Sequence, residues 1–313
     1  MKQKFLLLLT IFLGLGLQAQ PTSALMDDDY ALTIYPTTQT IELDPGDQYT
    51  GNVTVVNNGQ QPFTALISAA PYQVDSESYS PDFTTENAYT KLYNWITFPE
   101  DSYYLEPGAS AKVEYTVNIP EDAVGGGQYA AILARTEDTI KESDSIQVIS
   151  QVAGILYGRV NGEEMHPEGE LVEQDIPGFI VDGLLEVSET VYNTGNVDFK
   201  VNHSIVVTDV FSGKEILNSD SKGSDGLPLN TENVIVLPGT SRRNVLVWEN
   251  TPRLGVYQVK QTIMFLDQEV TDDRIVIFCP GWLLFSIIGL IALLILWIVL
   301  AARRRHHKEP QVF

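Results

Sequence analysis

The chain has 313 residues, with 41 acidic and 19 basic side chains, a formal net charge of −22 at pH 7 and one cysteine. This acidic charge repels nucleic acid and anionic lipid, which excludes them as partners. We interpret the excess of acidic residues as a charge that keeps the protein soluble, with binding of cationic partners or calcium as the alternative. A lone cysteine excludes an intrachain disulfide, so apolar cores must stabilise the fold, and the length predicts two domains.

Residues 1–24 have the layout of a secretory signal peptide. Lys2 and Lys4 precede an apolar run over 5–17, and small residues follow that run. This order predicts cleavage after Ala24, with Ala19 as the second choice. A retained signal anchor is the alternative, although the apolar run is short for a membrane span.

Residues 25–160 are interpreted as a first, membrane-distal β-domain. Short segments that alternate apolar and polar residues, separated by Gly, Pro and Asn turns, are typical of half-buried strands. Trp95 and its aromatic neighbours Tyr93 and Phe98 are expected to supply the large side chains of its core. Strands are predicted at 32–35, 40–43, 49–56, 62–70, 91–98, 111–119 and 145–160.

Within this domain, the polar stretch 75–87 predicts a long exposed loop. Tyr79, Phe83 and the adjoining Tyr89 offer aromatic faces among hydrogen-bonding groups, which suits stacking on sugar rings. We therefore predict these three residues as a binding site. A solvated loop without a ligand is the alternative.

Several turn motifs occur twice, which indicates two related domains in tandem. Each copy has an Asn-x-Gly turn, a Pro-Gly turn followed by an alternating strand, and a glycine shortly before a tyrosine that heads an apolar strand. The first copy has Asn57, Pro107-Gly108 and Tyr129, and the second has Asn193, Pro238-Gly239 and Tyr257. Chance similarity between turn-rich β-sequences is the alternative.

Residues 161–279 are interpreted as the second, membrane-proximal copy, entered through a bridge over 161–177. Strands are predicted at 183–193, 197–210, 234–237, 244–249, 257–266 and 274–278. About seven short strands per copy are typical of an immunoglobulin-like sandwich, here without the cysteine pair of antibody domains. The sequence therefore predicts an all-β fold of two tandem immunoglobulin-like β-sandwich domains followed by one transmembrane α-helix.

Residues 280–302 predict the transmembrane helix, because 282–302 contain no charged side chain. An apolar helix of this length reaches about 31 Å, the thickness of a hydrocarbon core. Trp282 and Trp297 lie towards its ends, where indole rings favour the interface. Arg303, Arg304 and Arg305 open the basic tail 303–313, so the positive-inside rule places the tail in the cytoplasm and 25–279 outside the cell. A buried core helix is the alternative.

The order of these segments resembles a known family. The second domain carries Tyr192-Asn193-Thr194-Gly195, Leu237-Pro238-Gly239, Trp248 and Leu254-Gly255-Val256-Tyr257, and a helix and a basic tail follow it. This arrangement is similar to that of the WxL-interacting cell-surface proteins of Gram-positive bacteria. The resemblance implies a distal domain that binds peptidoglycan, a proximal domain that binds host proteins, and WxL-domain proteins as partners. It transfers no site residue.

The sequence displays no constellation for catalysis, a metal or a cofactor. His166 lies in the predicted bridge and His203 in a predicted strand, and neither has partners at catalytic or metal-ligand spacing. We therefore expect a non-enzymatic protein without a cofactor. Cys279, beside the outer leaflet, is expected to be an inert thiol, with an intermolecular disulfide as the alternative.

These features predict a protein of the cell membrane whose extracellular β-domains bind cell-wall polymer, here peptidoglycan, or other surface proteins. The alternative is an assembly factor or chaperone for exported subunits, which takes a partner's β-strand at an exposed sheet edge. Both functions remain open at the level of the sequence.

Overall fold

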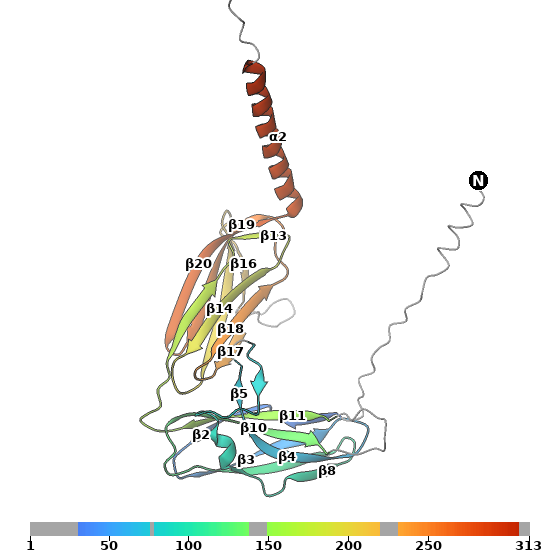
Figure 1. Cartoon of the computed structure of the whole chain (residues 1–313), viewed down its shortest axis with the longest axis vertical. Coiled ribbons are helices and arrows are strands. Elements are labelled where there is room, and N and C mark those ends of the chain that lie inside the picture. The colour runs from blue at the N-terminus through green and yellow to red at the C-terminus, as the bar shows by residue number, and fades with distance from the viewer. Residues whose placement is uncertain (1–30, 76–77, 138–148, 220–230, 307–313) are drawn as a thin grey trace, which may run out of the picture.

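The computed structural model describes residues 31–75, 78–137, 149–219 and 231–306, and the predicted signal peptide lies outside these ranges. Two β-sandwich domains are followed by one long helix (Figure 1). The strands of the first domain run across the view in Figure 1, and those of the second run along its length towards the helix. The protein is thus mostly β, with two immunoglobulin-like domains and one apolar C-terminal helix, which confirms the predicted fold class.

The first domain packs two sheets together. One has the strand order β1-β3-β9-β7, built from Leu32–Tyr35, Gln48–Asn57, Ser110–Asn118 and Ile96–Thr97. The other has the order β2-β11-β10-β4-β8, built from Thr38–Leu43, Gln151–Val160, Gly126–Thr136, Phe63–Pro71 and Ser102–Leu105. A small hairpin of β5 (Gln73–Val74) and β6 (Pro81–Asp82) projects towards the second domain (Figure 1).

Strand alternation explains how this domain forms its core. Along β9, Val113, Tyr115 and Val117 are buried, while Lys112 and Glu114 between them are exposed. Successive side chains of a strand point to opposite faces, so each sheet has one apolar face and the two apolar faces pack together. The resulting core takes side chains from both sheets.

The second domain packs a three-stranded sheet against a six-stranded one. The smaller sheet has the order β12-β14-β18, built from Gly169–Asp175, Leu185–Asn193 and Ser241–Trp248. The larger has the order β13-β20-β19-β15-β16, with β17 also paired to β15; these strands are Phe179–Val181, Gln268–Cys279, Gly255–Phe265, Phe199–Asp209, Glu215–Asn218 and Thr231–Val236. Pro280 alone separates β20 from the helix α2 (Gly281–His306).

A buried asparagine organises one end of the first domain. Nδ2 of Asn57 donates to the carbonyl oxygens of Gln61 at 2.9 Å and Leu105 at 3.0 Å. Its Oδ1 accepts the N–H of Gly59 at 2.9 Å. Asn57 is fully buried, so it satisfies backbone groups that water cannot reach.

The second domain repeats this network at the matching positions. Nδ2 of Asn193 donates to the carbonyl oxygens of Val197 and Val236, both at 2.9 Å, and its Oδ1 accepts the N–H of Gly195 at 3.0 Å. In each copy, one acceptor lies four residues after the asparagine and the other three residues before the glycine of the Pro-Gly turn. This shared network confirms that the two domains are structural repeats.

Two segments differ from the prediction. Residues 91–98 were expected to form a strand, but they form a 3-10 helix η2 (Lys91–Trp95) and then the two-residue β7, because the fully buried Leu92 anchors a helical turn in the first core. Residues 161–177 were expected to form a bridge, but they contain β12, which pairs with β14. As an edge strand with exposed residues on both faces, β12 carries little apolar alternation.

The second core contains a buried polar layer. Nδ1 of His203 lies 2.5 Å from Oε2 of Glu189, and both side chains are fully buried. Asn244 donates to Oε1 of Glu189 at 2.7 Å, and Nε2 of Gln261 lies 3.0 Å from Nε2 of His203. Along their strands Glu189, His203 and Gln261 each lie between two apolar clusters, so the polar layer divides the core.

Replacing Asn193 with alanine should destabilise the protein by at least about 2 kcal/mol, because each buried carbonyl left without a donor costs about 1–3 kcal/mol. Urea unfolding of the full-length protein in detergent, followed by tryptophan fluorescence, measures this loss. Asn250→Ala, at an exposed turn, is the matched control and should change the free energy of unfolding by less than about 0.5 kcal/mol. Equal midpoints for the two variants would contradict the role of Asn193.

Candidate functional site

Tyr79 connects the two domains. It lies between β5 and β6 with a φ of +53°, a backbone conformation that is uncommon for a residue other than glycine. Its hydroxyl donates to the carbonyl of Ile235 at 2.8 Å and accepts the N–H of Leu237 at 3.0 Å. The guanidinium carbon of Arg242 lies 4.2 Å from the ring centroid, a cation–π distance. Through Tyr79, the β5–β6 hairpin is fixed to the second domain.

A buried carboxylate forms a further polar contact between the domains, in addition to the bonds that Asn196 makes with the backbone of Gly125 and Gly127. Asp198 accepts hydrogen bonds from the hydroxyl of Tyr129 at 3.1 Å and from Nη2 of Arg159 at 3.0 Å, and its side chain is 2% exposed. Burial, reinforced by the charge of Asp198, raises the pKa of Tyr129, so the hydroxyl stays protonated as a donor. Because Tyr129 and Arg159 lie on β10 and β11, this contact seats the second domain on the larger sheet of the first.

The three aromatic residues predicted as a sugar site all lie at this junction. Tyr79 is bonded to the second domain, and Phe83 stacks on Tyr72 with ring centroids 6.1 Å apart. All three predicted residues pack partly buried against an apolar cluster that also includes Leu237 of the second domain. Tyr79 and Phe83 thus belong to a docked hairpin rather than to an exposed loop, whereas most other described residues of 75–87 are exposed as predicted. The binding role stays a prediction, and among the three Tyr89 lines the two pockets described next.

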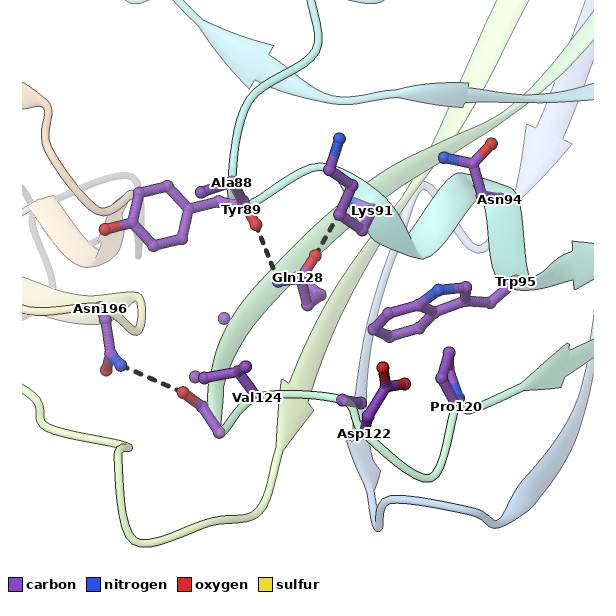
Figure 2. Close-up of a pocket in the computed structure, with 14 residues that line it drawn as sticks. Ala88, Tyr89, Lys91, Asn94, Trp95, Pro120, Asp122, Val124, Gln128 and Asn196 are labelled. Atoms are coloured by element: carbon purple, nitrogen blue, oxygen red, sulfur yellow. Dashed lines mark hydrogen bonds between the residues drawn. The ribbon is translucent and has the colours of Figure 1, made fainter.

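A pocket of about 530 Å³ opens at the junction beside the Gly-rich turn (Figure 2). Figure 2 shows Tyr89 and Trp95 at opposite sides of this pocket, with Gln128 between them. Gln128 is held by hydrogen bonds to the backbone of Lys91 and Ala88. The polar residues that line the pocket are Lys91, Asn94, Asp122, Gln128 and, from the second domain, Asn196.

A second hollow of about 520 Å³ shares Ala88 and Tyr89 with the first. Its lining adds the carboxylates of Asp75 and Asp82 and the turn at Pro238-Gly239. Aromatic faces among amide and charged groups suit a polar ligand, and two adjoining hollows suit an elongated one.

The strand β18 has one open edge. Its inner edge pairs with β14, and no strand pairs with its other edge within the ranges that the structure describes. The N–H of Asn193 donates to the carbonyl of Thr240, and hydrogen-bonded pairs alternate along an antiparallel ladder. The backbone groups of Arg243, Val245 and Val247 therefore point to the open edge. Val245 and Val247 are also 38% and 37% exposed.

The equivalent strand of the first domain is protected. Counted from the two Pro-Gly turns, Lys112 and Glu114 of β9 match Arg243 and Val245 of β18. Inward-facing or edge charges and short covering strands prevent pairing with other chains. In β9, Lys112 and Glu114 supply the charges and β7 covers Thr116, the match of Val247. At the matching positions, β18 has one charged residue, Arg243. Val245 stands in place of the charged Glu114, and Val247 stands where β9 is covered by β7.

The helix α2 has the length and hydropathy to cross a bilayer over Gly281–Arg303, and its apolar window is not buried by the rest of the protein. Trp282 and Trp297, predicted as interfacial anchors, are both exposed. The helix does not end at the predicted position 302; it continues through Arg303, Arg304 and Arg305 to His306. Residues 307–313 of the predicted tail lie outside the described ranges.

Other candidate groups for chemistry are dispersed or enclosed. The described residues contain no group of three or more His, Cys, Asp or Glu side chains that could hold a metal ion. His203 lies in the buried polar layer, which no substrate reaches, and His166 contacts the carbonyl of Glu164. The residues of the buried polar layer are spread over 73 positions of the sequence, from Glu189 to Gln261, so no local motif indicates the layer. Cys279 is buried, which favours the inert thiol over an intermolecular disulfide.

No protein-family model and no curated protein matches this sequence, so the resemblance to WxL-interacting proteins has no support from those comparisons. Similar solved structures include the class 5 fimbriae chaperone CfaA, with a TM-score of 0.38, 13% identity, and coverage of 78% of this chain and 99% of that one. The Escherichia coli chaperone DraB has a TM-score of 0.35 and 13% identity, with coverage of 79% of this chain and 97% of that one. The Pseudomonas aeruginosa chaperone CupB2 has a TM-score of 0.34 and 10% identity, with coverage of 77% of this chain and 99% of that one. Similarity at this level carries no argument about function.

Replacing Asp198 with alanine should loosen the junction, because Tyr129 and Arg159 lose their shared acceptor. Breaking a buried charge pair costs about 3–5 kcal/mol, and the partial exposure of Arg159 lowers our expectation to about 2 kcal/mol. Calorimetry of the full-length protein in detergent measures the loss, and limited proteolysis between 161 and 168 should accelerate.

Glu42→Gln is the matched control for this experiment. Glu42 lies 3.9 Å from the same guanidinium but is 60% exposed, so its loss should cost less than about 0.5 kcal/mol. Equal effects of the two substitutions would contradict the role of Asp198 at the junction.

Proposed function

We propose that this protein is a membrane-anchored, outward-facing binding protein that holds an exported polypeptide as an added strand on β18. The open edge of β18, with Val245 and Val247 exposed along it, is the observation that supports this proposal. An added strand would pair with the backbone of Arg243, Val245 and Val247 and cover both valines. Strand addition needs neither a cofactor nor a catalytic group.

Several modest terms contribute to such binding. Each backbone hydrogen bond contributes about 0.5–1.5 kcal/mol net. Side chains opposite Val245 and Val247 add about 0.2–1 kcal/mol per pair. Backbone pairing is independent of sequence, so the two valines favour a segment with apolar residues at alternate positions.

The anchor and the orientation complete the proposal. Gly281–Arg303 would cross the membrane, and Arg303, Arg304 and Arg305 would stay on the cytoplasmic side. Export through the signal peptide 1–24 would place both β-domains, proposed as 25–160 and 161–279, outside the cell. The resemblance to WxL-interacting proteins suggests the class of partner, which is another protein of the cell surface.

Val245→Pro should weaken strand addition without breaking the domain, because the N–H of Val245 points away from β14 and proline is tolerated on edge strands. Loss of one hydrogen bond and of local register, about 1.4 kcal/mol or more, weakens binding about tenfold. A photo-reactive amino acid at position 243 in living cells identifies the partner, and the dissociation constant of that partner is then measured for each variant.

Glu114→Pro makes the same backbone change at the matching position of β9 and serves as control. It should leave both the cross-link and the affinity unchanged. Undiminished cross-linking and affinity in Val245→Pro would show that the open edge of β18 does not hold the partner.

A second candidate function, binding of cell-wall polymer, is favoured by the two adjoining hollows around Tyr89. The side chains of Asn94 and Asp122 are exposed at the first hollow, where they offer polar contacts beside the rings of Tyr89 and Trp95. A glycan chain presents alternating apolar ring faces and hydroxyl groups, which this lining complements.

The double variant Asn94→Ala/Asp122→Ala should weaken retention of the full-length protein on purified cell-wall sacculi about tenfold, which corresponds to about 1.4 kcal/mol for two lost polar contacts. Lys112→Ala/Glu114→Ala, on the exposed face of β9, is the control and should retain full binding. Equal retention by the two double variants would exclude this pocket as the polymer site.

A further inference from the structure

Exposed apolar side chains gather at the end of the second domain from which α2 leaves. Phe211 is 84% exposed and Leu254 is 60% exposed, so neither contributes much to the domain core. Single exposed apolar residues are ordinary, but a cluster at one end of a domain indicates a contact surface. We call the following residues the apolar collar: Phe179, Val181, Leu184, Phe211, Leu254 and Ile277.

Strand pairing places the collar around the start of α2. Phe179 on β13 pairs with Ile277 near the end of β20. Leu254 directly precedes β19, whose first residue pairs with Phe278 of β20. Phe211 lies in the turn after β15, whose last residue pairs with the third residue of β19. In Figure 1, β13 and the upper ends of β19 and β20 accordingly lie at the base of α2.

No flexible linker separates this end of the domain from the helix. Pro280 is the single residue between β20 and α2. The carboxylate of Asp182, in the loop between β13 and β14, accepts the N–H of Gly281 at 2.6 Å. This bond satisfies a free N–H of the first helical turn and connects the helix to the domain. Because the apolar part of α2 begins at Gly281, the hydrocarbon boundary lies at the level of the collar.

The headgroup layer is thick enough to receive the collar. The hydrocarbon core of a bilayer is about 30 Å thick within a total of about 40–45 Å, which leaves a layer of about 5–7.5 Å on each side. Aromatic and aliphatic side chains favour this layer. The exposed charged residues that neighbour the collar in sequence have both signs, since Lys214 and Arg253 are accompanied by Asp182, Glu215 and Glu249, so apolar contact rather than net charge carries the interaction.

We propose that the apolar collar is a membrane-contact surface, in which Phe211, Leu254 and their neighbours insert among the phospholipid headgroups of the bilayer that α2 spans. The inference rests on the proposed membrane anchor. Contact around the helix, in addition to the helix itself, fixes the tilt of the second domain. Asp198 and Tyr79 then transmit that orientation to the first domain, so the edge of β18 is presented at a constant height and direction.

Nitroxide labels on single cysteines test the proposal in the full-length protein. Cys279→Ser removes the native thiol, and labels are attached after Phe211→Cys, Leu254→Cys, Met264→Cys or Ile295→Cys. Met264 is the matched control, because it is an exposed apolar residue of the same domain near the opposite end of β19. The protein is reconstituted into phosphatidylcholine vesicles. Collision rates with oxygen, which concentrates in lipid, and with a water-soluble nickel chelate are measured by electron paramagnetic resonance.

We expect the oxygen-to-nickel ratio at positions 211 and 254 to be several-fold higher than at 264, and the ratio at 295 to be the highest. Equal ratios at 211, 254 and 264, with 295 in lipid, would overturn the collar and leave the anchor intact. A water-exposed 295 would overturn both. Phe211 and Leu254 are exposed turn residues, so these substitutions should preserve the thermal midpoint, which is measured for every variant.

Discussion

The buried carboxylate of Asp198 determines how the two domains face each other, and the remaining surfaces depend on that arrangement. It accepts hydrogen bonds from Tyr129 and Arg159 of the first domain, while Tyr79 makes another polar contact through the hairpin. The carboxylate of Asp198 lies where water is excluded, so loss of its partners would leave it unsatisfied. Small inter-domain interfaces usually permit relative motion. Here these contacts, the bonds of Asn196 to Gly125 and Gly127, and an apolar cluster shared by both domains oppose such motion.

Without an intrachain disulfide, each sandwich relies on apolar packing and a few buried polar networks. Asn57 and Asn193 satisfy the same backbone groups in the two domains, and such a position accepts no apolar substitute because the carbonyls around it would lose their donor. The contact between Glu189 and His203 is different, because it lies inside the second domain between two apolar clusters. A buried polar contact of this kind is weak evidence for stability.

The strands that line a core could be predicted from alternation, because the burial of one face leaves a period of two in the sequence. β12 could not, since it is an edge strand with both faces in solvent. Tyr79 was assigned to an exposed loop because its neighbours are polar; its acceptor, Ile235, lies 156 residues away, and no local pattern encodes that contact. The open edge of β18 could not be predicted, because the spacing of residues in the sequence does not show which strands lie next to each other in a sheet. The segment Val245-Leu246-Val247-Trp248 does break the alternation, and that run of four apolar residues is the local signal of a strand with two apolar faces.

The difference between the two repeats is the strongest argument that the edge of β18 has a use. Both domains present the same strand after the same turn, and in β9 charges and a short covering strand prevent pairing. An exported protein with an unprotected edge and apolar side chains is exposed to pairing with its own copies. The formal net charge of −22 opposes that outcome, because two copies that approach each other repel across the whole surface, whereas a neutral or basic polypeptide does not experience this repulsion. An open edge on a strongly acidic body thus selects against self-association while leaving a foreign strand free to bind.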